Sequence, residues 1–195
     1  MMNFKPSRRR ALFFWVMLGC CVTTGVPAFD LAVGTPAAER ATARAVFTPQ
    51  DDVAGQIADA VRHARRQVLV QAFSFTHDGI AQELIDAHRR GVEVKLIADR
   101  EQTEKMDHGM VPRIAAAGVP VWLDGEHQSA HNKVLVIDAG TPAAMVVTGS
   151  FNFTRAAQYK NAENVVFLGA SATLAEAYAR NWQGHLAHSK PLMMH

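Results

Sequence analysis

Cysteine is scarce in this sequence. Only Cys20 and Cys21 occur among the 195 residues, and they are adjacent to each other near the start of the chain. A disulfide framework or a thiolate zinc site needs several spaced cysteines. Both cysteines also lie in a segment that we expect to be removed. The remaining chain would therefore have no disulfide, no thiolate metal ligand and no cysteine nucleophile.

Long apolar runs are also missing. The one clean run, Ala11 to Gly19, follows four basic residues and precedes the small residues Val26-Pro27-Ala28. This is the three-part layout of a secretory signal peptide. We therefore predict that residues 1–28 are a cleaved signal peptide and that the protein is periplasmic or secreted. An uncleaved N-terminal membrane anchor and lipidation at Cys20 are the alternatives, although the run is short for a membrane span.

The sequence has no strong excess of charge of either sign. The formal net charge is +2, but residues 1–28 contribute four basic residues and no acidic ones. The rest of the chain has 16 Lys and Arg against 18 Asp and Glu, which is a formal charge of −2. Any affinity for nucleic acid must therefore come from a local basic patch, because the overall charge does not provide it.

Beyond residue 28 the sequence predicts one α/β domain. We interpret residues 29–42 as an N-terminal lead-in, residues 43–190 as the domain and residues 191–195 as a tail. Strand-like and helix-like segments alternate through the domain, with Asp51 and Asp78 as the expected N-caps of its first two helices. Apolar runs such as Val134–Ile137 are typical of strands buried on both faces. The alternation indicates a single α/β sandwich, with a mixed β-sheet flanked by helices on both faces.

The residues that indicate chemistry lie between Ser129 and Leu168. His131 and Lys133 are two apart at the start of a predicted strand, so their side chains project from the same face. An imidazole beside an ammonium suits an anionic substrate, because the ammonium can neutralise phosphate oxygens while the imidazole attacks or moves a proton. Asp138 follows the same strand with the opposite parity, so we expect a structural role for it.

A second group of polar residues follows the next buried strands. Gly149-Ser150-Phe151-Asn152 comes directly after one predicted strand, and Glu163 directly precedes another. Ser150 and Asn152 are two apart, and Gly149 permits a close approach of the backbone to a ligand. These strand ends predict one polar pocket.

Together these residues resemble the phospholipase D superfamily. His131-x-Lys133-x4-Asp138 followed by Gly149-Ser150-x-Asn152 is similar to the family's signature, and the likeness is greatest to its small single-motif bacterial periplasmic nucleases. The resemblance implies an α/β fold, no metal and no other cofactor. It also implies a homodimer with a shared active site, because catalysis in the family takes two motifs and this chain has one.

The resemblance also implies roles for the site residues. His131 of one subunit would attack the phosphodiester and form a phosphohistidine, while His131 of the other would protonate the leaving oxygen. Lys133 and Asn152 would bind phosphate oxygens. Ser150 would form hydrogen bonds within the site, and Glu163 would orient a histidine ring.

Several other residues have two interpretations. His127 is four residues before His131, and we interpret it as an exposed loop residue and not as half of a metal pair. The C-terminal histidines are interpreted as solvated tail residues, not as metal ligands: His185, His188 and His195. The pairs Arg65-Arg66 and Arg89-Arg90 fit either a basic track for nucleic acid or helix C-termini. Phe73 is expected in the core, whereas Phe151 and Phe153 fit either the core or base stacking.

Three functions are consistent with these observations. The first is a metal-independent, non-specific endonuclease that acts on DNA, with RNA as a further substrate. The second is a phospholipase D-type hydrolysis of a membrane phospholipid such as cardiolipin. The third is a non-catalytic nucleic-acid-binding module, against which the intact motif argues. Basic and polar pocket walls would favour nucleic acid, and an apolar rim would favour lipid.

Overall fold

The structure is a computed structural model that describes residues 41–193, all of which fall in one compact unit. The predicted signal peptide, both cysteines and His195 lie outside the described residues. The strands are β1 Thr42–Phe47, β2 Gln67–Ala72, β3 Glu93–Asp99, β4 Val121–Asp124, β5 Lys133–Ile137, β6 Met145–Gly149, β7 Asn164–Gly169 and β8 Lys190–Pro191. The helices are α1 Val53–Arg62, α2 Asp78–Arg89, α3 Arg100–Lys105, α4 Val111–Ala116, α5 Arg155–Tyr159 and α6 Ala172–Leu186.

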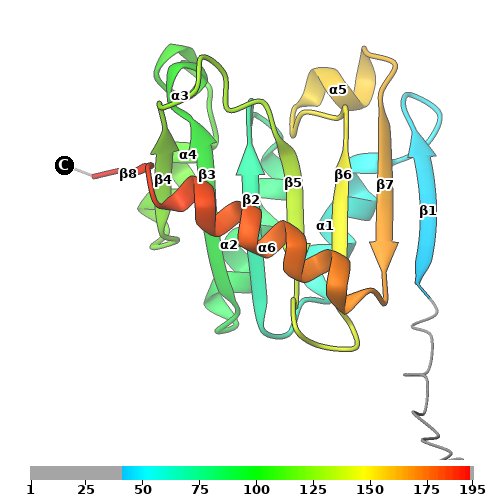
Figure 1. Cartoon of the computed structure of the whole chain (residues 1–195). Coiled ribbons are helices and arrows are strands. Elements are labelled where there is room, and N and C mark those ends of the chain that lie inside the picture. Colours follow the sequence, from blue (N-terminus) through cyan, green and yellow to red (C-terminus); the bar gives the residue numbers. More distant parts are fainter. Residues whose placement is uncertain (1–40, 194–195) are drawn as a thin grey trace, which may run out of the picture. The chain divides into compact units, whose positions relative to one another are not determined.

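The eight strands form one mixed sheet, in the order β1-β7-β6-β5-β2-β3-β4-β8 (Figure 1). The pairs β2–β3 and β3–β4 are parallel, and the other pairs are antiparallel. This confirms the predicted mixed sheet. Within the described residues no helix has the length and apolar character needed to cross a membrane.

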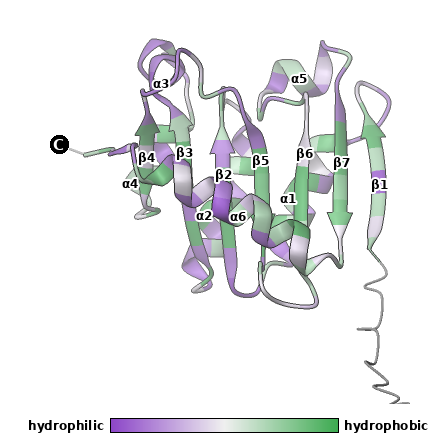
Figure 2. Ribbon diagram, viewed as in Figure 1, coloured by the Kyte–Doolittle hydropathy of each residue, from purple (hydrophilic) through white to green (hydrophobic). Residues whose placement is uncertain are grey.

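Helices cover both faces of the sheet, and the side chains of β2 show why. Val68 and Val70 belong to the core that α1, α2 and α4 cover, whereas Leu69 belongs to the core beneath α6. Alternate side chains of a strand point to opposite faces, so a strand between two helical layers must be apolar at almost every position. Figure 2 shows hydrophobic residues concentrated along the strands and hydrophilic residues at many of the loops. Trp182 anchors α6 by donating a hydrogen bond of 2.9 Å from its Nε1 to the carbonyl of Val70.

The two helix caps predicted from the sequence are each displaced by one residue. Asp52, not Asp51, caps α1 and accepts a hydrogen bond from the backbone of Gly55, while the Asp51 carboxylate accepts one from the Phe47 amide. His77, not Asp78, caps α2. The His77 amide binds the carbonyl of Phe153, and its extended backbone conformation is that of an N-cap residue.

The ends of the domain also differ from the predicted boundaries. β1 begins at Thr42, so the last residue assigned to the lead-in belongs to the sheet. Lys190 and Pro191 pair with β4 as β8, so the sheet extends into the predicted tail. β8 is an edge strand of only two residues, and a sequence pattern does not reveal so short a strand.

Candidate active site

The predicted site residues gather at one rim of the sheet. This upper rim is where β2, β3, β4 and β6 end and where β5 and β7 begin; it is uppermost in Figure 1. A cavity of about 490 Å³ opens there, and we call it the His131 pocket. Its lining consists of His131, Asn132, Lys133, Thr148, Gly149, Ser150, Asn152 and Glu163. Five of the six predicted site residues therefore share one pocket.

His131 stands exposed at this rim, beside Phe73 and just before β5 begins. The His131 and Phe73 rings lie with their centroids 4.4 Å apart at an angle of 56°. Phe73 is half-buried and packs against the His131 ring without lining the cavity, so its assignment to the core was wrong. Its amide also donates to the carbonyl of Asn132, which ties the chain after β2 to the segment that presents His131. The imidazole is thus positioned by an aromatic neighbour and remains accessible.

Lys133 is the nearly buried cation of the pocket, with 7% of its surface exposed. Its ammonium donates to the carbonyl of His131 and lies 4.9 Å from the centroid of the Phe73 ring. Burial lowers the pKa of Lys133 to about 8, although the nearby Glu163 carboxylate opposes this shift. An ammonium held away from water without a bonded carboxylate is a suitable site for an anion.

Glu163 is held by its own network. Both of its carboxylate oxygens accept hydrogen bonds. One bond comes from the Ser150 hydroxyl at 2.5 Å, and the other comes from the side-chain NH2 of Asn161 at 2.9 Å. Its backbone N–H donates to the hydroxyl of Thr48, a residue that the sequence did not single out. None of the described contacts joins Glu163 to His131, so the orientation of a histidine ring by Glu163 stays a prediction.

Asn152 carries a polar atom without a partner. Its buried Oδ1 is the one such side-chain atom found in the part of the chain that the structure describes. Buried polar atoms are nearly always hydrogen-bonded, so this orphaned acceptor indicates a place for a donor group of a ligand. A phosphate oxygen is itself an acceptor and would be bound by the NH2 group of the same amide. Gly149 has a different role from the one expected. A Cβ there would meet the backbone oxygen of Asn164 at 2.1 Å, so glycine permits the close pairing of β6 with β7.

Asp138 lies at the opposite end of β5, away from the pocket. Its buried carboxylate accepts backbone hydrogen bonds of 2.7 to 3.2 Å from Arg65, Arg66 and Gln67. Its backbone is left-handed, with φ of 50°, a conformation that Asp tolerates better than most residues. These contacts fit the structural role expected for Asp138.

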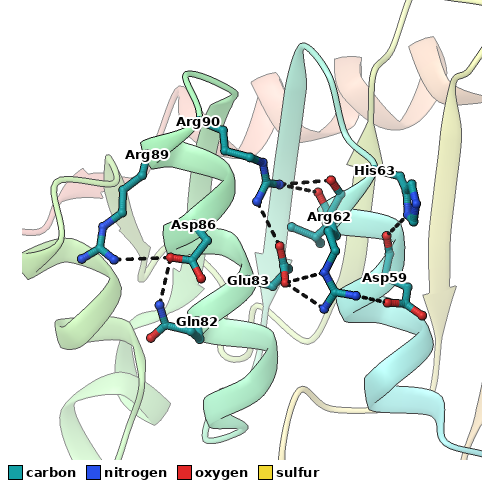
Figure 3. Close-up of polar contacts among 9 residues, drawn as sticks. Asp59, Arg62, His63, Gln82, Glu83, Asp86, Arg89 and Arg90 are labelled. Atoms are coloured by element: carbon teal, nitrogen blue, oxygen red, sulfur yellow. Dashed lines mark hydrogen bonds and ion pairs between the residues drawn. The ribbon is translucent and has the colours of Figure 1, made fainter.

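The suggested basic track does not reach the pocket. Arg90 bonds to Glu83 and to two backbone carbonyls of α1, and Arg89 pairs with Asp86 (Figure 3). These arginines lie at the C-terminal end of α2, and Arg65 and Arg66 precede β2, so all four are at the end of the sheet opposite the upper rim. Arg90 ties α2 to α1, Arg89 pairs within α2, and Arg65 and Arg66 stand before β2. Phe151 and Phe153 are likewise fully buried and are core residues.

Two C-terminal histidines were assigned wrongly. His185 and His188 are half-buried and bond to Asp124 at the end of β4, at 2.9 and 3.2 Å. His127 is an exposed loop residue, as predicted, and it also contacts this carboxylate at 3.3 Å. More than fifty residues separate the two halves of this group, so spacing alone could not reveal it. His195 lies outside the described residues.

Comparison with known proteins gives a consistent result. Residues 57–186 match the family described as "Cardiolipin synthase, PLD-like domain". The chain is 38% identical over 143 residues to a phospholipase D of Rickettsia bellii, covering 73% of this chain and 68% of that protein. It is 30% identical over 117 residues to a mitochondrial cardiolipin hydrolase of Chlamydomonas reinhardtii, covering 60% of this chain and half of that protein.

Solved structures show the same fold. The phospholipase D family member Nuc from Salmonella typhimurium has a TM-score of 0.72 and 29% identity, covering 79% of this chain and 99% of that one. NucT from Helicobacter pylori has a TM-score of 0.70 and 20% identity over 78% of this chain and 99% of that chain. The sequence match, the shared fold and the polar pocket agree. The chain belongs to the phospholipase D superfamily and is a phosphodiesterase.

Proposed function

We propose that this phosphodiesterase is an exported endonuclease that hydrolyses DNA, with RNA as a further substrate. The observation that supports nucleic acid over lipid is the lining of the His131 pocket. All eight lining residues are polar or glycine, and a nearly buried ammonium lies among them. A phosphate of a nucleic-acid backbone needs such cationic and amide groups. A lipid headgroup site would also need apolar walls for the chains.

The proposed reaction proceeds in two steps at His131. A ring nitrogen attacks phosphorus, so that an N–P bond forms while the P–O bond to the leaving oxygen breaks. A second imidazole gives its proton to the leaving oxygen. In the second step this imidazole takes a proton from water, whose oxygen displaces the phosphoryl group from His131. Lys133 and Asn152 hold the non-bridging oxygens, while Ser150 fixes the carboxylate of Glu163.

The second imidazole is proposed to come from a second copy of the chain. The sequence contains one His-x-Lys-x4-Asp motif, so a two-fold dimer would bring together two His131 rings. His131 is exposed at the rim, and a partner can therefore approach it. No metal is required in this scheme. In the described residues the one group suited to metal binding is centred on Asp124 and shares no residue with the pocket lining.

A phospholipid substrate is the second candidate. Two large apolar side chains are exposed near the same rim, Phe47 at 54% and Tyr159 at 64%. Phe47 directly precedes Thr48, and Tyr159 lies two residues before Asn161. Thr48 and Asn161 both form hydrogen bonds with Glu163, so the two exposed aromatic residues lie close to the pocket in the sequence. Exposed aromatic residues suit a membrane surface as well as an unstacked base. The similarity to proteins named phospholipase D and mitochondrial cardiolipin hydrolase also supports this candidate.

One experiment separates these candidates. The purified protein and its His131→Asn variant receive plasmid DNA, RNA and cardiolipin vesicles in parallel, with and without EDTA. We expect nicking of DNA that persists in EDTA and disappears in the variant, with the activity sedimenting as a dimer. Hydrolysis of cardiolipin without cleavage of DNA would refute the nuclease proposal. Activity in a monomer would refute the shared site.

A further inference from the structure

The Asp124 cluster, formed by Asp124, His127, His185 and His188, is a second group of chemically capable side chains. The side chain of Asp124 is fully buried, and both of its oxygens have polar partners. Oδ1 accepts the backbone N–H of Glu126 at 3.1 Å and also lies 3.4 Å from Nδ1 of His127. Oδ2 faces three ring nitrogens: His185 Nδ1 at 2.9 Å, His188 Nε2 at 3.2 Å and His127 Nδ1 at 3.3 Å.

The four inward-facing atoms have nearly the spacing of a metal coordination shell. All of them lie within 4.8 Å of one another. A tetrahedral Zn²⁺ with Zn–N bonds of 2.0–2.1 Å holds its ligand atoms roughly 3.4 Å apart. The distances to Oδ2 lie within about 0.5 Å of that value, and the remaining pairs need to approach by about 1.4 Å at most. The His127 and His188 side chains are 47% and 30% exposed, so rotation of these rings can close the gap.

A hydrogen bond from the backbone also fixes the orientation of the Asp124 carboxylate. The Glu126 amide holds one carboxylate oxygen of Asp124 and leaves the other directed at the imidazoles. Carboxylate ligands of bound metals are commonly oriented by hydrogen bonds of this kind. A cavity of about 300 Å³, lined by Asp124, Glu126 and His127 among others, offers an ion a path from solvent.

We propose that Asp124, His127, His185 and His188 form a structural zinc site. Three imidazoles and one carboxylate suit a first-row transition metal, whereas Mg²⁺ and Ca²⁺ prefer all-oxygen shells. Four protein ligands complete a tetrahedron and leave no open position for substrate, which is the pattern of structural sites. The ion would join the end of β4, the loop leading to His131, and the C-terminal end of α6. This inference is independent of the substrate of the His131 pocket.

Binding is tested on the full chain without a polyhistidine tag. Cys20→Ser, Cys21→Ser and His195→Ala form the background, because these residues could also bind zinc. The apo-protein is titrated with ZnCl₂ by calorimetry, with CoCl₂ by visible absorption, and with MgCl₂ as the negative probe. We expect one Zn²⁺ per chain, a tetrahedral Co²⁺ spectrum and no Mg²⁺ binding.

Variants identify the ligands. Asp124→Asn and His185→Ala should weaken zinc binding at least tenfold, and His108→Ala, an exposed histidine outside the cluster, should leave it unchanged. Because substitution of the buried Asp124 or the half-buried His185 could disturb folding, His127→Ala serves as the mild variant, checked by circular dichroism. The absence of stoichiometric zinc in the background protein would overturn the proposal. Zinc binding that His127→Ala leaves unaltered in a folded chain would overturn the four-ligand site.

Discussion

The His131 pocket and the Asp124 cluster share one rim of the sheet and use the same kinds of side chain in opposite ways. In the pocket, the acid Glu163 is occupied by Ser150 and Asn161, so the ammonium of Lys133 has no carboxylate bonded to it. In the cluster, the acid is buried and three imidazoles converge on it. The first arrangement suits an incoming anion, and the second suits a cation. Residue types alone therefore do not determine whether a site binds an anion or a cation. The groups that are bonded to the carboxylate determine it.

The largest test of this comparison is loss of the imidazole in the pocket. His131→Asn should lower the rate of phosphodiester cleavage at least about a thousandfold, because no other group of the pocket can replace a nucleophile. The thermal midpoint should move by less than about 2 °C, since the side chain is exposed. Initial rates and a thermal scan measure both effects, with His108→Asn as the matched control. Retention of more than a tenth of the activity would contradict the assignment.

A smaller effect concerns the cation of the pocket. Because burial lowers the pKa of Lys133 to about 8, kcat/KM should fall above pH 8 as the ammonium loses its proton, by about tenfold for each pH unit. The measurement is kcat/KM between pH 6.5 and 9.5. A profile that is flat across pH 8 to 9.5 would show that the charge on Lys133 is not used.

The same shift predicts a change in stability. Between pH 8 and about 10.5 the unfolded chain binds one more proton than the folded chain at this position, so the contribution of Lys133 to stability rises with pH. Below pH 8 the cost of burying the ammonium is fully present. Lys133→Met should therefore abolish cleavage at pH 7 and raise the thermal midpoint. A lower midpoint in this variant would mean that the ammonium stabilises the fold.

The smallest effect on activity is expected from a chelator. Stripping zinc from the Asp124 cluster should lower the thermal midpoint by about 5–10 °C, which corresponds to an ion at about a hundred times its Kd. The initial rate at 25 °C should change less than twofold, because the cluster shares no residue with the pocket lining. Thermal scans and rates before and after EDTA, with zinc added back, measure both. Loss of phosphodiester cleavage in EDTA with an unchanged thermal midpoint would contradict both a structural role for zinc and a metal-independent reaction.

Much of the fold and pocket could be predicted because the informative patterns are local. The strands β5, β6 and β7 are each five or six residues long, and each contains a continuous apolar run of three or four residues. The residues at their ends share a rim because these strands are neighbours and antiparallel. Val53, Ile57 and Val61 recur every fourth residue, a spacing that predicts one apolar stripe of a helix, and all three are buried.

What could not be predicted depends on contacts between distant segments. The Asp124 cluster joins residues 61 and 64 positions apart, and no spacing rule connects them. The cap of α2 was misplaced because Asp is the better N-cap by type, whereas the bond from the His77 amide to Phe153 fixes where the helix starts. Phe73 was expected in the core because a strand pattern cannot show that its strand has already ended at Ala72.

The tryptophans of α6 and β4 give the molecule an internal optical reporter. Trp122 and Trp182 meet edge to face with ring centroids 6.1 Å apart, and the strand of one and the helix of the other both lead to the Asp124 cluster. Their emission therefore reports on the packing of α6 against the sheet. Co²⁺ or Cu²⁺ bound at the cluster should quench it, whereas the His131 pocket borders neither ring. Occupation of one site can thus be followed without a label while the other turns over substrate.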